Sequence, residues 1–142
     1  MPAVEVIEVK RHYQAGATTV RAVDGVSLTV EKGEFMAIAG PSGSGKTTLL
    51  NLIGALDEPT SGTIRIDGVD LAGLSRRQVA DLRRDKVGFV FQAYNLIPVL
   101  TAAENAEYVL ELQRVPRVER RKRISQLFTE LGIGDLVDAW PG

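Results

Sequence analysis

The stretch Gly40-Pro41-Ser42-Gly43-Ser44-Gly45-Lys46-Thr47 fits the pattern G-x-x-x-x-G-K-[ST]. Glycines in such a loop accept unusual backbone angles and let main-chain amides approach an anion closely. The helix expected after the loop points the positive end of its dipole at the same place. Lys46 supplies a cation for the β- and γ-phosphates, the Thr47 hydroxyl is a hard ligand suited to Mg²⁺, and Thr48 can donate to the α-phosphate. Residues 40–48, the phosphate loop, are therefore predicted to bind a chain of phosphates.

The residues on either side of the phosphate loop have the pattern of a strand and a helix. The run Phe35–Ala39 is continuously apolar, which is typical of a strand buried on both faces of a mostly parallel sheet. After the loop, Leu49, Leu52, Ile53 and Leu56 fall on one face of a helix. This strand–loop–helix context favours a phosphate site over a chance glycine-rich turn.

Several further strands are predicted from short β-prone runs. Before the loop they cover residues 4–9, 18–23 and 26–30, the last with strict alternation of apolar and polar residues. After the helix, Ile64 and Ile66 mark a short strand closed by the turn pair Asp67-Gly68. The apolar run 87–91 predicts one more strand, which stops at Gln92.

The second half of the chain is mostly helical. Ser75 with Gln78, and Thr101 with Glu104, form two capping boxes, which predict helices that run to about residues 84 and 112. A last helix carries its apolar stripe within residues 124–131 and is followed by a glycine at the C-terminal cap. The order of elements predicts an α/β fold with a helical addition.

Composition excludes several classes of protein. Lys+Arg 17 against Asp+Glu 18 gives a formal net charge of -1, whereas general polyanion binders carry a strong basic excess, so no nucleic-acid partner is expected. The absence of cysteine excludes disulfides, thiolate metal sites and a cysteine nucleophile. The start Met1–Glu5 has no signal-peptide pattern, and no apolar run reaches the roughly 18–20 residues that cross a bilayer. We expect a soluble, cytoplasmic chain.

Motifs on both sides of the phosphate loop carry a family resemblance. They are Gly33-Glu34-Phe35, Gly40–Leu50, Gly54–Gly62, Leu82-Arg83-Arg84, Val87–Gln92, Asn95–Pro98 and Leu100–Asn105. Together they resemble the ATP-binding subunits of ABC transporters, and within these the subfamily of lipoprotein-releasing, macrolide-export and related peptide exporters. The resemblance covers nearly all of the chain, from about Val4 to Gly142.

The resemblance implies a fold and a set of site residues. It implies a P-loop NTPase (RecA-like) core portion at about 33–94, after an antiparallel β-subdomain at 1–32 and before the start of a helical subdomain at 95–142. The implied cofactors are ATP and Mg²⁺. Tyr13 matches the family's aromatic residue that stacks on adenine, and Gln92 matches the glutamine that reaches the Mg²⁺ and the attacking water. Lys46 and Gln92 are thus the candidate catalytic residues, and Thr47 and Gln92 the candidate metal ligands.

The resemblance also implies partners that the chain itself does not contain. A complete subunit of this kind forms a head-to-tail homodimer with two ATP between the subunits and drives a transmembrane permease subunit from the inner face of the membrane. The family's signature segment, its Mg²⁺-binding Asp, its catalytic Glu and its switch histidine fall after Gly142. We therefore expect an N-terminal fragment with no useful ATPase rate alone and with marginal stability.

Two other readings stay open on the residues alone. The phosphate loop is shared by other P-loop enzymes such as GTPases and small-molecule kinases, which a strong preference for GTP would favour. A non-hydrolysing nucleotide-binding module is the second alternative. The transported substrate is not indicated by any motif, because specificity in such systems lies in the membrane partner.

Overall fold

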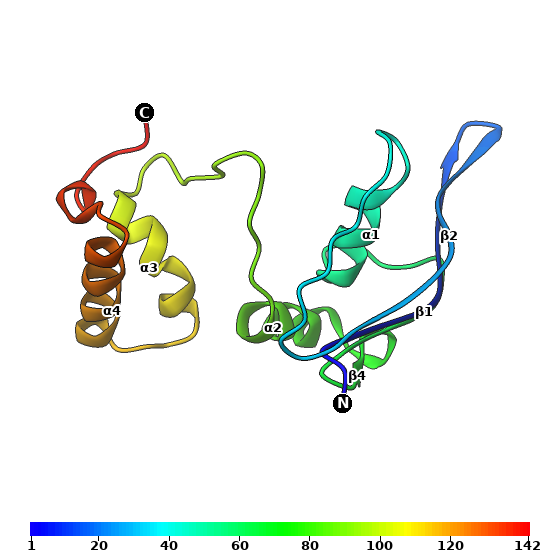
Figure 1. Cartoon of the computed structure of the whole chain (residues 1–142), viewed down its shortest axis with the longest axis horizontal. Coiled ribbons are helices and arrows are strands. Elements are labelled where there is room, and N and C mark those ends of the chain that lie inside the picture. The colour runs from blue at the N-terminus through cyan, green and yellow to red at the C-terminus, as the bar shows by residue number, and fades with distance from the viewer. The chain divides into compact units, whose positions relative to one another are not determined.

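The computed structural model describes residues 1–142, which form two compact units, residues 1–83 and 84–142. The first contains β1 (Val4–Ala15), β2 (Thr18–Val30), α1 (Lys46–Ile53), β3 (Ser61–Ile66), β4 (Val69–Asp70), η1 (Leu71–Gly73) and most of α2 (Arg76–Lys86). The second contains α3 (Ala102–Leu112), α4 (Arg117–Glu130) and η2 (Gly134–Leu136). Figure 1 shows these elements along the chain. None of the helices combines the length and the apolar character that a membrane crossing requires.

A four-stranded antiparallel sheet with the order β2-β1-β3-β4 forms the body of the first unit. The strand β1 lies inside the sheet, since Val4 is paired with Val30 of β2 on one side and with Ile66 of β3 on the other. The β3–β4 connection is the expected tight turn, in which Asp67 and Gly68 both have positive φ. The antiparallel sheet that the resemblance implied is present, but it also includes β3 and β4, which the resemblance placed in the core portion.

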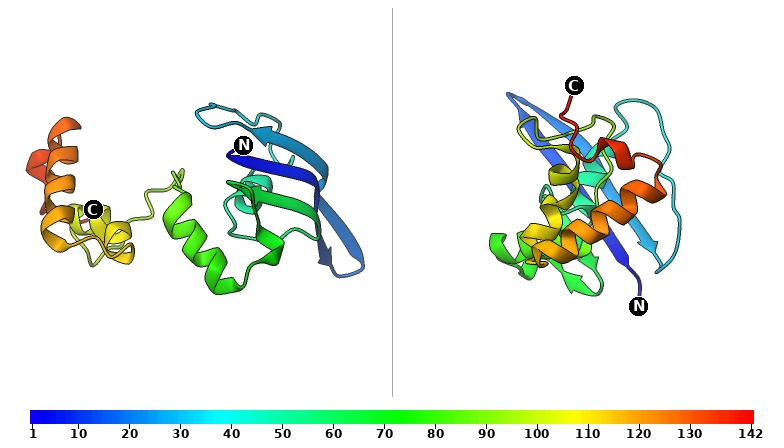
Figure 2. Two further views of the ribbon diagram at one scale, coloured as in Figure 1. Left: turned by 90° about the horizontal axis from the view of Figure 1, so that it is seen from below. Right: turned by 90° about the vertical axis from the view of Figure 1, so that its left-hand side faces the viewer.

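The core of the first unit lies between this sheet and α1 (Figure 2). Leu49 and Leu52 come from one face of α1 and are buried against Val6 and Val9 of β1. Val6 and Val9 are three residues apart, so in a regular strand their side chains would lie on opposite faces. The register shift between them allows both to enter the core. Val23 and Ile64 complete this cluster of buried residues.

The second unit is an antiparallel pair of helices, α3 and α4, drawn in yellow and orange in Figure 1. Ile124 and Phe128 of α4 are its buried apolar residues. Glu107 of α3 is also buried, with Arg120 and Arg121 of α4 each 3.8 Å from its carboxylate. A buried carboxylate is stable only beside such partners, so this ion cluster accompanies the apolar contact between the two helices.

Both predicted capping boxes are confirmed. Ser75 and Gln78 exchange hydrogen bonds before α2, and Thr101 and Glu104 do the same at the start of α3. Gly132, with φ +73, follows α4 as expected. The two segments predicted at 18–23 and 26–30 are a single strand, β2. Gly25 is an extra residue between the pairs Val9–Val26 and Lys10–Asp24, and the pairing with β1 continues on both sides of it.

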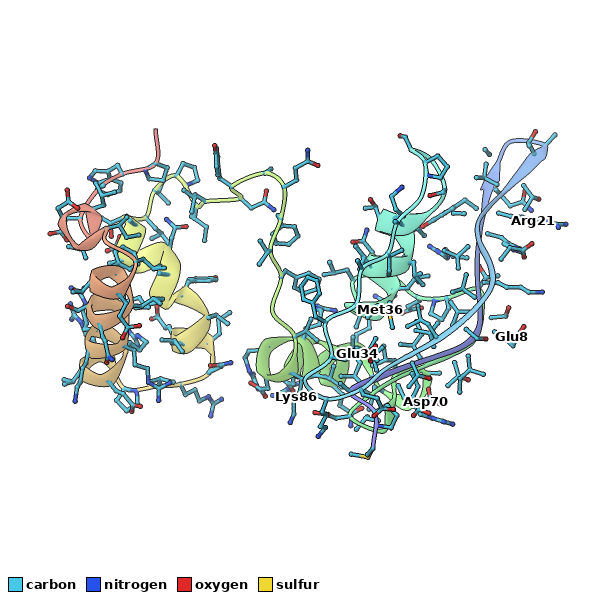
Figure 3. All side chains as sticks on the ribbon, viewed as in Figure 1. Glu8, Arg21, Glu34, Met36, Asp70 and Lys86 are labelled. Atoms are coloured by element: carbon cyan, nitrogen blue, oxygen red, sulfur yellow. The ribbon has the colours of Figure 1, made fainter.

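The strands predicted at Phe35–Ala39 and Val87–Phe91 are wrong for this chain. Neither run is a strand, and Phe35 is 97% exposed. Met36 marks the first of these segments in Figure 3. A strand needs a neighbouring backbone to receive its hydrogen bonds, but β1–β4 pair only with one another and the second unit contains no strand. The subdomain boundaries predicted near residues 32 and 94 stay predictions.

Candidate functional site

The phosphate loop leads directly into α1, which begins at Lys46. Gly45 is the N-cap of this helix, with φ +92, and its carbonyl accepts the amide of Leu49 at 2.9 Å. A Cβ on Gly45 would lie only 2.0 Å from the backbone oxygen of Ala22 in β2. Glycine is therefore required at this position both for the left-handed angle and for the close approach of the two backbones.

Ala22 lies at an irregularity in the pairing of β1 with β2. Arg11 is paired with Val23 and His12 with Arg21, so Ala22 is an extra residue without a partner on β1. Such a bulge bends the strand locally. The fold thus places an irregular part of β2 next to the point where the phosphate loop becomes a helix.

The ammonium group of Lys46 lies within the loop. Its Nζ donates to the carbonyl oxygens of Gly40 and Pro41, both at 2.7 Å, and to the Ser44 hydroxyl at 3.2 Å. The Ser44 amide in turn donates to the Pro41 carbonyl at 3.2 Å. The positive charge is therefore placed beside the glycine-rich turn, where an anion bound by the loop amides would meet it.

A cavity of about 560 Å³ opens beside the phosphate loop. It is lined by residues 20–22 of β2 and by Ser42, Gly43, Gly45, Lys46, Thr47 and Thr48. The charged side chains among these residues, Arg21 and Lys46, are both basic, and the N-terminus of α1 faces the same region. Basic side chains and free helix amides at one place can hold an anion.

Tyr13, predicted to stack on a base, lies near the end of β1 and is 38% exposed. Its hydroxyl donates to Asp57 Oδ2 at 2.9 Å. Arg11 donates to both oxygens of the same carboxylate at 2.9 Å, and its guanidinium carbon lies 4.4 Å from the centre of the Tyr13 ring. Tyr13 does not line the cavity of the phosphate loop, so its role in base binding stays a prediction.

The carboxylate of Asp57 is held in its charged form. Partial burial would raise its pKa, but hydrogen bonds from the Glu58 amide, the Tyr13 hydroxyl and the Arg11 guanidinium outweigh burial and lower the pKa below the usual value of 3.8. Sequence reasoning missed Arg11 and Asp57. The alternation along a strand could have placed Arg11 on the same face as Tyr13, but no pattern links either residue to Asp57.

Gln92, the other residue predicted to act near the nucleotide, belongs to the second unit. It is exposed and lies at a bend in the irregular segment between α2 and α3. Its assignment as a catalytic residue and metal ligand therefore stays a prediction. His12, the only histidine, bonds to Asp24 at 2.9 Å and does not line the cavity of the phosphate loop.

The fold and the loop together define a domain of the P-loop type. Residues 23–141 match the family described as "ABC transporter". The chain belongs to this family, and its fold is that of the family's ATP-binding cassette. The expected resemblance is thereby confirmed.

Two curated relatives illustrate the kind of protein to which the chain is similar. One is the macrolide export ATP-binding/permease protein MacB of Hyphomonas neptunium, 47% identical over 141 residues, or 99% of this chain and 22% of that protein. The other is an uncharacterized ABC transporter ATP-binding protein of Thermotoga maritima, 45% identical over 93% of this chain and 56% of its own length. The chain thus spans only part of each relative.

Solved structures agree with this assignment. The ATP-binding cassette MJ0796, in a dimeric post-hydrolysis state bound to ADP and Pi, superposes with a TM-score of 0.89 at 40% identity. That match covers 97% of this chain and 61% of the cassette. A second dimeric structure of MJ0796 gives a TM-score of 0.90 at 39% identity with the same coverage.

Proposed function

We propose that this chain binds Mg·ATP through the phosphate loop and, within a complete ABC transporter subunit, couples ATP hydrolysis to export or release of a substrate. The observation that carries the proposal is the Lys46 ammonium, held beside the loop carbonyls at the N-terminus of α1. A fixed cation next to unpaired helix amides favours a multiply charged anion such as a triphosphate. The lining of the adjacent cavity, basic and without a carboxylate, supports the same ligand.

The donor set of the loop fits Mg²⁺ that arrives with its nucleotide. Mg²⁺ is typically held by one or two protein oxygens together with substrate phosphates and water. Thr47 lines the cavity, and no cluster of three or more acidic or histidine side chains is present that would form an all-protein metal site. Thr47 would hold the ion, joined by Gln92 as the family pattern implies. When bound, Mg²⁺ neutralises charge on the phosphates.

Each remaining site residue has a distinct part in this proposal. The backbone amides of the loop, from every residue of 40–48 except Pro41, wrap the phosphates, and Lys46 stabilises the charge on the β- and γ-phosphates. Tyr13 stacks on adenine, and Gln92 positions the attacking water without acting as a strong base. Lys46 and Gln92 are accordingly the proposed catalytic residues among these 142.

Hydrolysis and transport require partners. We propose a homodimer of ATP-binding subunits, supported by the dimeric structures of MJ0796, and a transmembrane permease, supported by the relatives named as ATP-binding/permease proteins. Such a complex places the subunit on the inner face of the membrane. Because phosphoryl transfer is catalysed almost entirely by positioning and charge stabilisation, the 142 residues alone should have no useful ATPase rate.

The test is Mg·ATP binding by the intact protein, measured by equilibrium dialysis. Lys46→Ala removes a charge-assisted contact and is expected to weaken binding by about 10- to 100-fold. Lys122→Ala is the matched control, because Lys122 is exposed on α4 and its loss removes one positive charge outside the phosphate loop. The proposal is wrong if the unchanged protein does not retain Mg·ATP, or if both variants bind it equally well.

A further inference from the structure

Tyr13 is held at its phenol end and covered on one face of its ring. The hydroxyl donates to Asp57 Oδ2 at 2.9 Å, and this hydrogen bond restricts rotation of the side chain. The guanidinium of Arg11 lies 4.4 Å from the ring centre and occupies one face. The ring therefore has only one face left for a ligand, although the side chain is 38% exposed.

Asp57 is itself fixed from two directions. Its Oδ1 accepts the Glu58 amide at 2.8 Å and Arg11 Nη2 at 2.9 Å. Its Oδ2 accepts Arg11 Nε at 2.9 Å as well as the Tyr13 hydroxyl. Such a two-pronged contact between guanidinium and carboxylate fixes orientation as well as distance. Arg11, Tyr13 and Asp57 thus form a closed triangle, the tyrosine clamp, in which each member contacts the other two.

The tyrosine clamp is not needed to attach β1 to the segment that carries Asp57. The Thr60 amide donates to the Lys10 carbonyl at 2.8 Å, and the His12 amide donates to the Thr60 hydroxyl at 2.9 Å. These contacts join the same two segments a few residues away through the main chain of β1. A clamp of side chains next to an existing main-chain connection suggests that its purpose is the orientation of Tyr13.

We propose that Arg11 and Asp57 are positioning residues that hold the free face of Tyr13 ready to stack on the base of the bound nucleoside triphosphate. The inference rests on the proposed function of the phosphate loop. An exposed tyrosine loses rotational freedom when a base stacks on it, and a ring that is already fixed loses less. The clamp therefore contributes to affinity for the nucleoside and not to affinity for the phosphates.

This difference defines the experiment. Two ligands are titrated into the intact protein in the presence of Mg²⁺: ATP, and inorganic tripolyphosphate, which carries the charges but no base. Tyr13→Phe keeps the aromatic ring and removes the hydroxyl contact, and Asp57→Asn removes the charge that holds Arg11. Each variant is expected to bind ATP about three- to tenfold more weakly and to bind tripolyphosphate as well as the unchanged protein does.

Two further variants complete the set. Tyr13→Ala removes the stacking surface and is expected to cost about 5- to 150-fold in ATP affinity. Tyr108→Phe makes the same chemical change as Tyr13→Phe on an exposed tyrosine of α3 and should change neither affinity. Because Tyr13 and Asp57 act together, the double variant Tyr13→Phe/Asp57→Asn should bind ATP little worse than either single variant.

Each contrary result has a separate meaning. Equal losses for ATP and tripolyphosphate would show that the clamp only supports the fold, and unchanged ATP binding in both single variants would show that Tyr13 needs no positioning; either result overturns the inference. If Lys46→Ala binds tripolyphosphate as tightly as the unchanged protein does, the proposed function fails instead. Far-UV circular dichroism of each variant separates loss of folding from loss of binding, and Asp57→Asn keeps the test decisive should Tyr13→Phe not fold.

Discussion

The substitution Gly45→Ala tests how the start of α1 is built. Gly45 has φ +92, and an added Cβ would lie 2.0 Å from the Ala22 oxygen and 3.2 Å from the Ala22 carbonyl carbon. The first distance is more than about 1 Å short of any normal non-bonded contact. The obstacle is main chain and not a flexible side chain, so either β2 or the phosphate loop must move.

The expected cost follows from two separate effects. An alanine in a left-handed conformation costs about 1–2 kcal/mol, and relief of overpacking costs about a further 1–3 kcal/mol. Gly45→Ala should therefore lower the free energy of unfolding by about 2–5 kcal/mol. Since the part that moves carries the amides of the phosphate loop, Mg·ATP binding should be lost as well.

Gly16→Ala is the matched control. Gly16 lies in the turn between β1 and β2, has φ +64, and has nothing within 4 Å of an added Cβ. It should show only the backbone cost, about 1–2 kcal/mol, with normal nucleotide binding. Urea unfolding and dialysis of both variants measure the two effects. Equal destabilisation by the two substitutions, or normal Mg·ATP binding by Gly45→Ala, would refute the reasoning.

Two other predictions concern single side chains. Asn105→Ala removes an amide that donates to the carbonyls of Ile97, Leu100 and Thr101 and accepts from the Ile97 amide. The free energy of unfolding should fall by about 1–3 kcal/mol, and the Ile97 amide should exchange its hydrogen faster. Unchanged exchange at Ile97 would contradict this prediction. The lowered pKa of Asp57 means that its contribution to stability is complete above its usual pKa of 3.8 and is lost as pH falls through the lower folded value. Asp57→Asn should therefore lose less stability than the unchanged protein as the pH falls through and below 3.8, and parallel curves would count against the assignment.

Local sequence signals predicted the helices and the junction between the loop and α1 well. A capping box involves residues three apart, and the loop pattern lies within eight consecutive residues. Both motifs can therefore be recognised from a short stretch of sequence. Ser75 with Gln78 and Thr101 with Glu104 form the expected pairs of hydrogen bonds. The family was likewise predictable, because its motifs extend along most of the chain.

Contacts between distant residues were not predictable in the same way. The approach of Gly45 to Ala22 depends on a bulge in β2, and the clamp on Tyr13 depends on Asp57, which is 44 positions away in the chain. Neither bulges nor long-range side-chain bonds have a periodic signature in the sequence. The position of the functional side chains therefore had to come from the fold.

The apolar run at residues 35–39, which is not a strand, shows which side of the phosphate loop is anchored. Phe35 is almost fully exposed, and Ile38 is the residue of this run that packs against the core. On the helix side, Leu49 and Leu52 are buried and the Gly45 backbone meets β2. The shape of the loop is thus set by α1 and by the hydrogen bonds of Lys46, and little by the segment before it. Because phosphate binding uses the amides nearest the helix, this one-sided anchoring is sufficient to place them, and changes at the helix side should affect binding more than changes at residues 35–39.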